Sequence, residues 1–111
     1  MNRVMNALGL CRRAGALICG APMICTELRG KKKPIIVLEA CDTSKGTNKK
    51  LIDKCSFYEV RLVKLDIGGE ELARAVGKTG QIAAVAVTDE NLAKLVEKSL
   101  CESGICQQSG N

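Results

Sequence analysis

The sequence predicts an α/β protein: a three-layer α/β/α sandwich around a four-stranded sheet that is mixed and largely parallel. Helical and extended patterns alternate along most of the chain. Two extended segments, residues 35–38 and 82–87, are apolar throughout, which is typical of strands that helices cover on both faces. The length of 111 residues fits one domain. We expect this domain over residues 1–100 and a polar C-terminal tail over residues 101–111.

The first helix and the first strand are expected before Gly20. Val4, Leu8 and Cys11 recur at i, i+4 and i+7, which gives one apolar helical face. A glycine at position 15 ends this helix, as a glycine in the left-handed conformation often does. The apolar run over residues 16–19 is too short for a helix, so it predicts an edge strand.

A second helix is expected to start at Gly20, Ala21 and Pro22. Proline is favoured in the first turn because its missing N–H would have no partner there. The pattern predicts a helix over residues 22–29 that ends at Gly30 and leads into three consecutive lysines. These lysines either solvate the end of a surface helix or form part of an edge that binds a polyanion.

The remaining elements continue the alternation. Strands are expected over residues 35–38, 60–65 and 82–87, and helices over residues 48–56, over residues 70–76 and from residue 89 onward. Thr47 or Asn48 is expected to cap the first of these helices, and Thr88 the last. The side chains expected to face the sheet from these two helices are Leu51, Ile52, Cys55, Leu92, Leu95 and Val96.

Composition excludes several classes of protein. No apolar run approaches the roughly 20 residues that a transmembrane helix needs. The N-terminal segment lacks the apolar stretch and cleavage site of a secretory signal, so we expect a cytoplasmic protein. The chain has seven cysteines but neither a histidine nor a C-x-x-C pair. Mixed Cys/His zinc sites are therefore excluded, and we expect reduced core thiols, no metal and no cofactor.

Motifs for catalysis are missing as well. The Gly-Lys-Thr triplet at residues 77–79 lacks the upstream glycine of a phosphate-binding loop, and it follows a helix instead of a strand. Glu39 and Asp42 follow an expected strand, where α/β sheets place ligands. A loop after a strand is usually polar in any case, so the sequence favours a protein that is not an enzyme. A thiol enzyme or sensor that uses several cysteines is the alternative in this class.

Positive charge is concentrated in one half of the chain. Residues 1–54 hold eleven basic and four acidic side chains, whereas residues 55–111 hold six and eight, within a net charge of +5. A basic half on a single domain indicates a polyanionic partner, although basic residues also solubilise a surface. Phe57 and Tyr58 are the chain's aromatic residues. Because proteins that bind extended single strands use many aromatic rings, a duplex or folded RNA fits better.

Several blocks of sequence occur in an order that is specific in combination. They are LGLCRRAG at 8–15, PIIVLEACDTS at 34–44, NKKLIDKCSFYEV at 48–60, EELARAVGK at 70–78 and IAAVAVTDENLAKLV at 82–96. Together they resemble the L7Ae/L30e family of ribosomal proteins, and especially its small bacterial members, over nearly all of residues 3–100. The resemblance implies an α/β/α sandwich that binds the kink-turn, a sharply bent RNA duplex, without catalysis.

In this family the start of the second helix and the loop before the last strand hold the RNA. The resemblance and the basic residues together predict these RNA-binding residues: Arg13, Gly20, Ala21, Pro22, Thr26, Lys31, Lys32, Lys33, Lys78, Thr79, Gly80, Gln81 and Ile82. The partner expected from the resemblance is structured RNA, such as ribosomal RNA. We expect a monomer that has no small-molecule substrate and no membrane partner.

The helix start departs from the family pattern, which has asparagine, glutamate and lysine where this chain has Pro22, Met23 and Thr26. Gly20 and Ala21 match the pattern. Asparagine and glutamate read base edges, which proline and methionine cannot do, so we expect contacts mainly to the RNA backbone. The alternative function is a protein-interaction module of the same fold that has lost specific RNA readout. The basic half of the chain has no obvious role in such a module.

Overall fold

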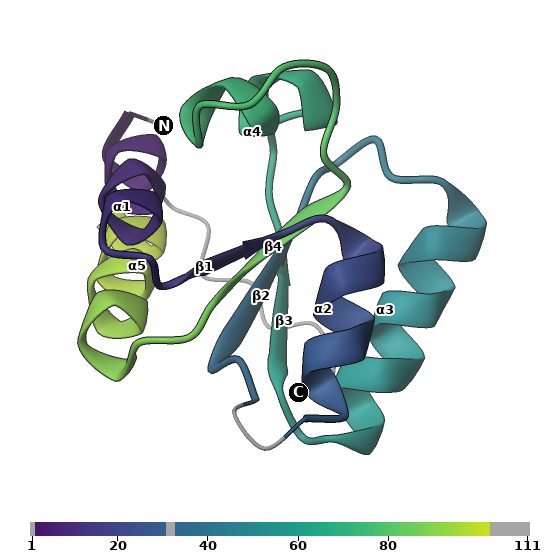
Figure 1. Ribbon diagram of the computed structural model, residues 1–111. Helices are drawn as coiled ribbons and strands as arrows, with labels where there is room; N and C mark the ends of the chain where they lie inside the picture. The colour runs from purple at the N-terminus through teal and green to yellow at the C-terminus, as the bar shows by residue number, and fades with distance from the viewer. Residues whose placement is uncertain (1, 31–32, 103–111) are drawn as a thin grey trace.

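The computed structural model describes residues 2–30 and 33–102, in which helices and strands alternate as the sequence predicts (Figure 1). The elements of this part of the chain are α1 (Asn2–Arg13), β1 (Leu17–Cys19), α2 (Ala21–Leu28), β2 (Ile36–Glu39), α3 (Lys45–Phe57), β3 (Arg61–Lys64), α4 (Gly69–Ala75), β4 (Ala84–Val87) and α5 (Glu90–Glu102). The fold class predicted from the sequence is confirmed. Of the tail expected over residues 101–111, Cys101 and Glu102 belong to α5, and residues 103–111 lie outside the described residues, as do Lys31 and Lys32.

The four strands form one sheet in the order β1-β4-β2-β3. β4 runs antiparallel to both of its neighbours, β1 and β2, so β2 and β3 form the one parallel pair of neighbouring strands in this sheet. The sheet is therefore mixed, as expected, but the prediction that it is largely parallel is wrong. The reason is the connection between β3 and β4. The seven-residue α4 lies at the sheet end where β3 finishes, so the chain re-enters the sheet from that same end (Figure 1).

The helices cover both faces of the sheet, as the apolar strands require. α1, α4 and α5 lie on one face, and α2 and α3 lie on the other (Figure 1). Every residue of β2 and of β4 is buried. The expected apolar face of α1 is also confirmed, because Val4, Leu8 and Cys11 are fully buried.

Two apolar side chains predicted to face the sheet are instead on the surface. Ile52 is 44% exposed and Leu95 is 38% exposed. Each lies one position from a fully buried residue, Leu51 in α3 and Val96 in α5. Successive residues of a helix are rotated by about 100°, so an apolar residue beside the inward stripe can still face water.

Two helix starts differ from the prediction because nearby residues cap them. α3 begins at Lys45, and the hydroxyl oxygen of Ser44 accepts a hydrogen bond from the Thr47 amide at 3.3 Å. At the start of α5 a carboxylate oxygen of Asp89 accepts one from the Leu92 amide at 2.9 Å. The expected caps at Thr47 or Asn48 and at Thr88 are therefore wrong. Serine and aspartate are both strong N-cap residues; Ser44 lies three positions before Thr47, and Asp89 directly follows Thr88.

Candidate nucleic-acid interface

One end of the sheet gathers segments that are far apart in the sequence. β1, β2 and β3 finish there and β4 begins there, since Ala84 pairs with Glu39 and Glu39 with Lys64. The amide of Gly20 donates to the carbonyl oxygen of Ala84 at 2.9 Å. We call this end the Gly20 edge. It comprises the start of α2, residues 40–44 and residues 77–83.

Gly20 is the N-cap residue of α2 and has a backbone conformation that favours glycine. Its φ is 97° and its ψ is 137°. No side chain caps the helix start, and Pro22 has no amide hydrogen to offer. The first-turn N–H groups of Ala21 and Met23 have no carbonyl partner within the helix. The start of α2 therefore presents backbone donors and the positive end of the helix dipole, a combination that binds phosphate.

The side chains around this helix start are short of hydrogen-bond donors. Pro22 and Met23 are exposed, and Met23 is 53% exposed. The exposed Thr26 hydroxyl donates to the carbonyl of Pro22 at 3.1 Å, one turn back in the same helix. Its proton is thus already used within the protein. This surface can contact RNA by its backbone amides and by apolar packing, and its side chains offer little to a base edge.

The loop before β4 supplies the second part of the Gly20 edge. Gly77 and Gly80 have φ values of 75° and 83°, so glycine permits both turns of the loop. Its two ends are anchored, because the Lys78 amide donates to the Ala73 carbonyl and the Ile82 amide to the Gly69 carbonyl. The side chains of Lys78, Thr79 and Gln81 and the backbone of Gly80 are exposed, whereas Ile82 is buried.

Residues 40–44 connect the two sides of the Gly20 edge. The Ala40 amide and the Thr43 hydroxyl both bond to the carbonyl oxygen of Ala83, at 2.8 and 3.2 Å. A carboxylate oxygen of Asp42 accepts from the Gly69 amide at 2.9 Å, at the start of α4. Asp42, one of the two acids considered for catalysis, therefore has a structural role at this helix start.

The other acid, Glu39, is buried directly beneath the Gly20 edge. It is 1% exposed, and its two carboxylate oxygens lie 2.8 and 2.7 Å from the side-chain nitrogen of Asn48. This contact ties the end of β2 to the first turn of α3. Because Glu39 is inaccessible to a ligand, its position favours a structural role over catalysis.

Arg12 supports the loop although it was not among the predicted site residues. Its guanidinium donates to the carbonyl oxygen of Val76 at 2.7 Å, in the turn that leads to Lys78. The sequence contained only a weak signal for this role. An arginine in the last turn of a helix is already explained by the negative end of the helix dipole.

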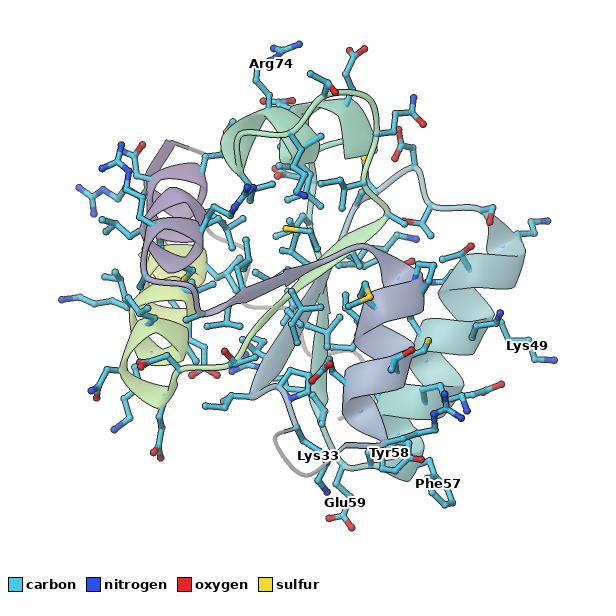
Figure 2. The ribbon with its side chains drawn as sticks, viewed as in Figure 1. Lys33, Lys49, Phe57, Tyr58, Glu59 and Arg74 are labelled. Carbon is cyan, nitrogen blue, oxygen red and sulfur yellow. The ribbon has the colours of Figure 1, made fainter. Side chains whose placement is uncertain are left out.

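Lysines continue the basic surface from the Gly20 edge onto α3. Lys45, Lys49 and Lys50 are exposed on the first half of this helix (Figure 2 labels Lys49, which points to solvent). Acidic side chains are present on the α4 side, where Glu70 lies 4.0 Å from Arg74. The positive side of the Gly20 edge is therefore the side formed by the start of α2, Lys78 and the first half of α3.

A comparison with protein families identifies the fold family of this chain. The model of the ribosomal protein L7Ae/L30e/S12e/Gadd45 family matches residues 2–97. The chain belongs to this family. The resemblance inferred from the sequence blocks is thus confirmed.

Relatives of this L7Ae-family chain come from bacteria. It is 35% identical over 92 residues to the RNA-binding protein YlxQ of Enterococcus faecium, a match that covers 83% of this chain and 85% of that protein. It is also 35% identical over 86 residues to the RNA-binding protein YlxQ of Bacillus subtilis strain 168, covering 78% of this chain and 83% of that protein.

Solved structures share the fold of this family member. A protein of unknown function from Bacillus halodurans superposes with a TM-score of 0.76 at 27% identity, covering 87% of this chain and 99% of that one. The Giardia lamblia 15.5kD RNA binding protein superposes with a TM-score of 0.74 at 16% identity, covering 96% of this chain and 88% of that one. The second likeness concerns the fold alone.

The structure brings some of the predicted site residues together and separates others. The residues gathered at the Gly20 edge are Gly20, Ala21, Pro22, Thr26, Lys78, Thr79, Gly80, Gln81 and Ile82. Arg13 ends α1 and precedes β1, whereas Gly20 follows β1. Lys33 precedes β2 and lies at the opposite end of the sheet, beside Tyr58 (Figure 2). Lys31 and Lys32 lie outside the described residues.

The cysteines of the described chain are free thiols, and two of them, Cys11 and Cys55, are buried. Burial raises the pKa of the Cys55 thiol to about 12, with smaller contributions from Cys25 and Glu39. Burial likewise raises the pKa of Cys11, with a smaller contribution from Asp89. These two thiols are protonated at neutral pH and are therefore poor nucleophiles.

Two further kinds of site are missing from the part of the chain that the structure describes. Across residues 2–30 and 33–102, no group of three or more cysteine, aspartate or glutamate side chains is placed to hold a metal ion. Over the same residues, no helix is long and apolar enough to cross a membrane.

Proposed function

We propose that this protein binds structured RNA at the Gly20 edge, without catalysis and mainly through contacts to the RNA backbone. The observation that carries the proposal is the uncapped start of α2, which Gly20 holds against β4 beside the exposed loop of residues 78–81. The names of the two YlxQ relatives, which are RNA-binding proteins, support the same function. We further propose that the protein acts as a cytoplasmic monomer.

The chemistry of the edge favours shape recognition over sequence recognition. A helix N-terminus and lysine side chains bind phosphates, which fix the register of a complex but carry no sequence information. The exposed side chains of Pro22 and Met23 offer no polar group to a base. We therefore propose a bent duplex of the kink-turn type as the preferred RNA, recognised by its backbone path, and ribosomal RNA as one source of it.

A titration at several salt concentrations tests this proposal. A kink-turn RNA and a straight duplex of equal length are each titrated with the wild-type protein, with Lys78→Gln and with Lys94→Gln. Lys94 is exposed on α5, outside the Gly20 edge, and is the matched control. We expect tighter binding of the kink-turn RNA, and a slope of log K against log salt that falls by about one for Lys78→Gln only.

Two results would contradict parts of the proposal. Equal affinity for the bent and the straight RNA would remove the kink-turn preference and leave general binding to the RNA backbone. Binding of neither RNA at low salt would remove RNA binding altogether and would favour the alternative, a protein-interaction module of the same fold.

A further inference from the structure

The opposite end of the sheet carries both aromatic rings of the chain. Phe57 ends α3, and its ring is 78% exposed. Its centroid lies 4.9 Å from that of Tyr58, with the two ring planes at 83°, an edge-to-face pair (Figure 2). We call this end the Tyr58 edge. A phenyl ring with this exposure is available to stack against a ligand.

The backbone holds the two rings in place. Tyr58 is half-buried and packs against the core between α2, α3 and the sheet. Glu59 follows with a φ of 59°, a left-handed conformation that is uncommon outside glycine. This turn lets the Val60 amide donate to the Cys55 carbonyl at 2.8 Å and sends the chain into β3. The backbone therefore fixes the position of Phe57, and its side chain remains exposed to solvent.

Cations surround the rings. The ammonium of Lys33 lies 5.8 Å from the centroid of the Tyr58 ring. Lys54 and Lys50 precede Phe57 by three and seven positions, which places them on its side of α3. Two carboxylates, Asp53 and Glu59, are also nearby in sequence. Among the described residues, neither forms an ion pair with these three lysines.

A basic surface joins the two ends of the sheet along α3. The exposed or half-exposed lysines of this helix are Lys45, Lys49, Lys50 and Lys54. A shallow groove of about 280 Å³ lies on the outer face, lined by Gly46, Lys49, Lys50, Asp53 and Lys54. At ~1.5 Å per residue, the 13 residues of α3 span roughly 20 Å. The α3 track, defined as these four lysines and Phe57, therefore leads away from the Gly20 edge.

We propose that the α3 track binds an unpaired RNA segment that continues from the duplex held at the Gly20 edge, and that one base of this segment stacks on Phe57. The inference rests on the proposed function. Lysines one helical turn apart neutralise successive phosphates, and an aromatic ring stacks any base. A length of roughly 20 Å corresponds to about six nucleotides if the unpaired strand stays stacked with the ~3.4 Å spacing of a duplex strand.

Charge distinguishes this partner from a protein. The centre of a protein interface is depleted of charged residues around its aromatic anchors. Phe57 instead has lysines on its own helix face, and Lys33 lies against the neighbouring ring. A ligand that carries negative charge and flat apolar groups fits this combination of lysines and aromatic rings, and unpaired RNA has both properties.

Two RNAs test the inference: a kink-turn duplex and the same duplex with an unpaired extension of about six nucleotides that carries 2-aminopurine. We expect the extension to tighten binding by the wild-type protein about fivefold to tenfold, and its fluorescence to be quenched by stacking. Phe57→Ala is expected to abolish the quenching, to reduce the gain in affinity to the part that the lysines supply, and to leave affinity for the plain duplex unchanged. Phe57→Trp, which keeps an aromatic face, is expected to retain both effects.

The lysines of the track provide a second measurement. Lys54→Gln is expected to lower the salt slope for the extended RNA by about 0.7, without changing the slope for the plain duplex. Lys94→Gln on α5 is the control and is expected to change neither slope.

The outcomes separate this inference from the function on which it rests. Equal affinity of the wild-type protein for the two RNAs would overturn the inference alone, and so would quenching that survives Phe57→Ala. Binding of neither RNA would overturn the inference together with the proposed function. A plain-duplex affinity that falls in Phe57→Ala would also overturn it, since the ring would then belong to the duplex interface.

Discussion

The Gly20 edge and the Tyr58 edge are built in different ways. The Gly20 edge is made of backbone: a glycine with a positive φ, two anchored loops and a helix start without a cap. The Tyr58 edge is made of side chains, with an exposed phenyl ring and a lysine over a tyrosine. The hydrogen bonds of the first join separate elements, whereas those of the second lie within the turn that ends α3.

This difference teaches how binding and stability are connected at each end. A change that disturbs the Gly20 edge must also disturb the sheet, because β1 and β4 meet there. A change at the Tyr58 edge removes atoms that mainly face water. We therefore expect changes at the Gly20 edge to weaken both folding and RNA binding, and changes at the Tyr58 edge to weaken RNA binding alone.

The largest effect is expected beneath the Gly20 edge. Asn48→Ala leaves the buried carboxylate of Glu39 without its amide partner, which should lower the free energy of unfolding by about 3 kcal/mol. Urea denaturation measures this change. Asn91→Ala, on the exposed start of α5, is the matched control and should stay within about 0.5 kcal/mol of the wild type. A loss in Asn48→Ala no larger than that of the control would show that the contact adds nothing.

A smaller effect is expected at Gly20 itself. Gly20→Ala places a β-carbon on a residue with a φ of 97°, and the strain should cost about 2 kcal/mol of unfolding free energy. Displacing the α2 amides should also weaken RNA binding, by about tenfold or more. Gly46→Ala is the control, since no atom lies within 4 Å of the added carbon and α3 should gain about 0.5–1 kcal/mol. Similar unfolding midpoints for the two variants would contradict this prediction.

Arg12 should have a smaller effect again. Arg12→Ala removes the hydrogen bond to the Val76 carbonyl, so we expect a loss of about 1.5 kcal/mol in stability and weaker RNA binding through a looser loop. Arg13→Ala compares the neighbouring arginine, which we predicted from the sequence to bind RNA. Denaturation of both variants measures how much each arginine stabilises the fold, and RNA titration measures how much each contributes to binding. The prediction fails if Arg12→Ala is as stable as the wild type, whatever the stability of Arg13→Ala.

The smallest effect on folding is expected at the Tyr58 edge. Phe57→Ala removes a ring that is 78% exposed, so the free energy of unfolding should change by less than about 0.5 kcal/mol. Thermal denaturation followed by circular dichroism checks this. A loss above about 1 kcal/mol would mean that the edge-to-face contact with Tyr58 supports the fold, and the contrast between the two ends would disappear.

Local sequence patterns predicted most of the fold. The apolar faces and runs identified every helix and strand that the structure describes, because burial gives a helix one apolar face and a covered strand a continuous apolar run. Strand direction was not predictable in this way. It depends on where a seven-residue helix returns the chain to the sheet, and the alternation of elements does not contain that information.

The candidate site was predictable only where it is local in sequence. Gly20 and the loop before β4 were expected from the family pattern. The contact between Glu39 and Asn48 joins a strand to a helix, and the contact of Arg12 with Val76 joins residues 64 positions apart. Such pairs depend on the tertiary register, which no local pattern specifies.

The position of β4 has a consequence for protein synthesis. Among the described residues, β1 is an edge strand whose one neighbour is β4, and β4 is the last strand to be made. A nascent chain therefore exposes α2 long before the strand that fixes Gly20 has left the ribosome. Pairing that is distant in sequence thus delays assembly of the Gly20 edge until β4 has been made.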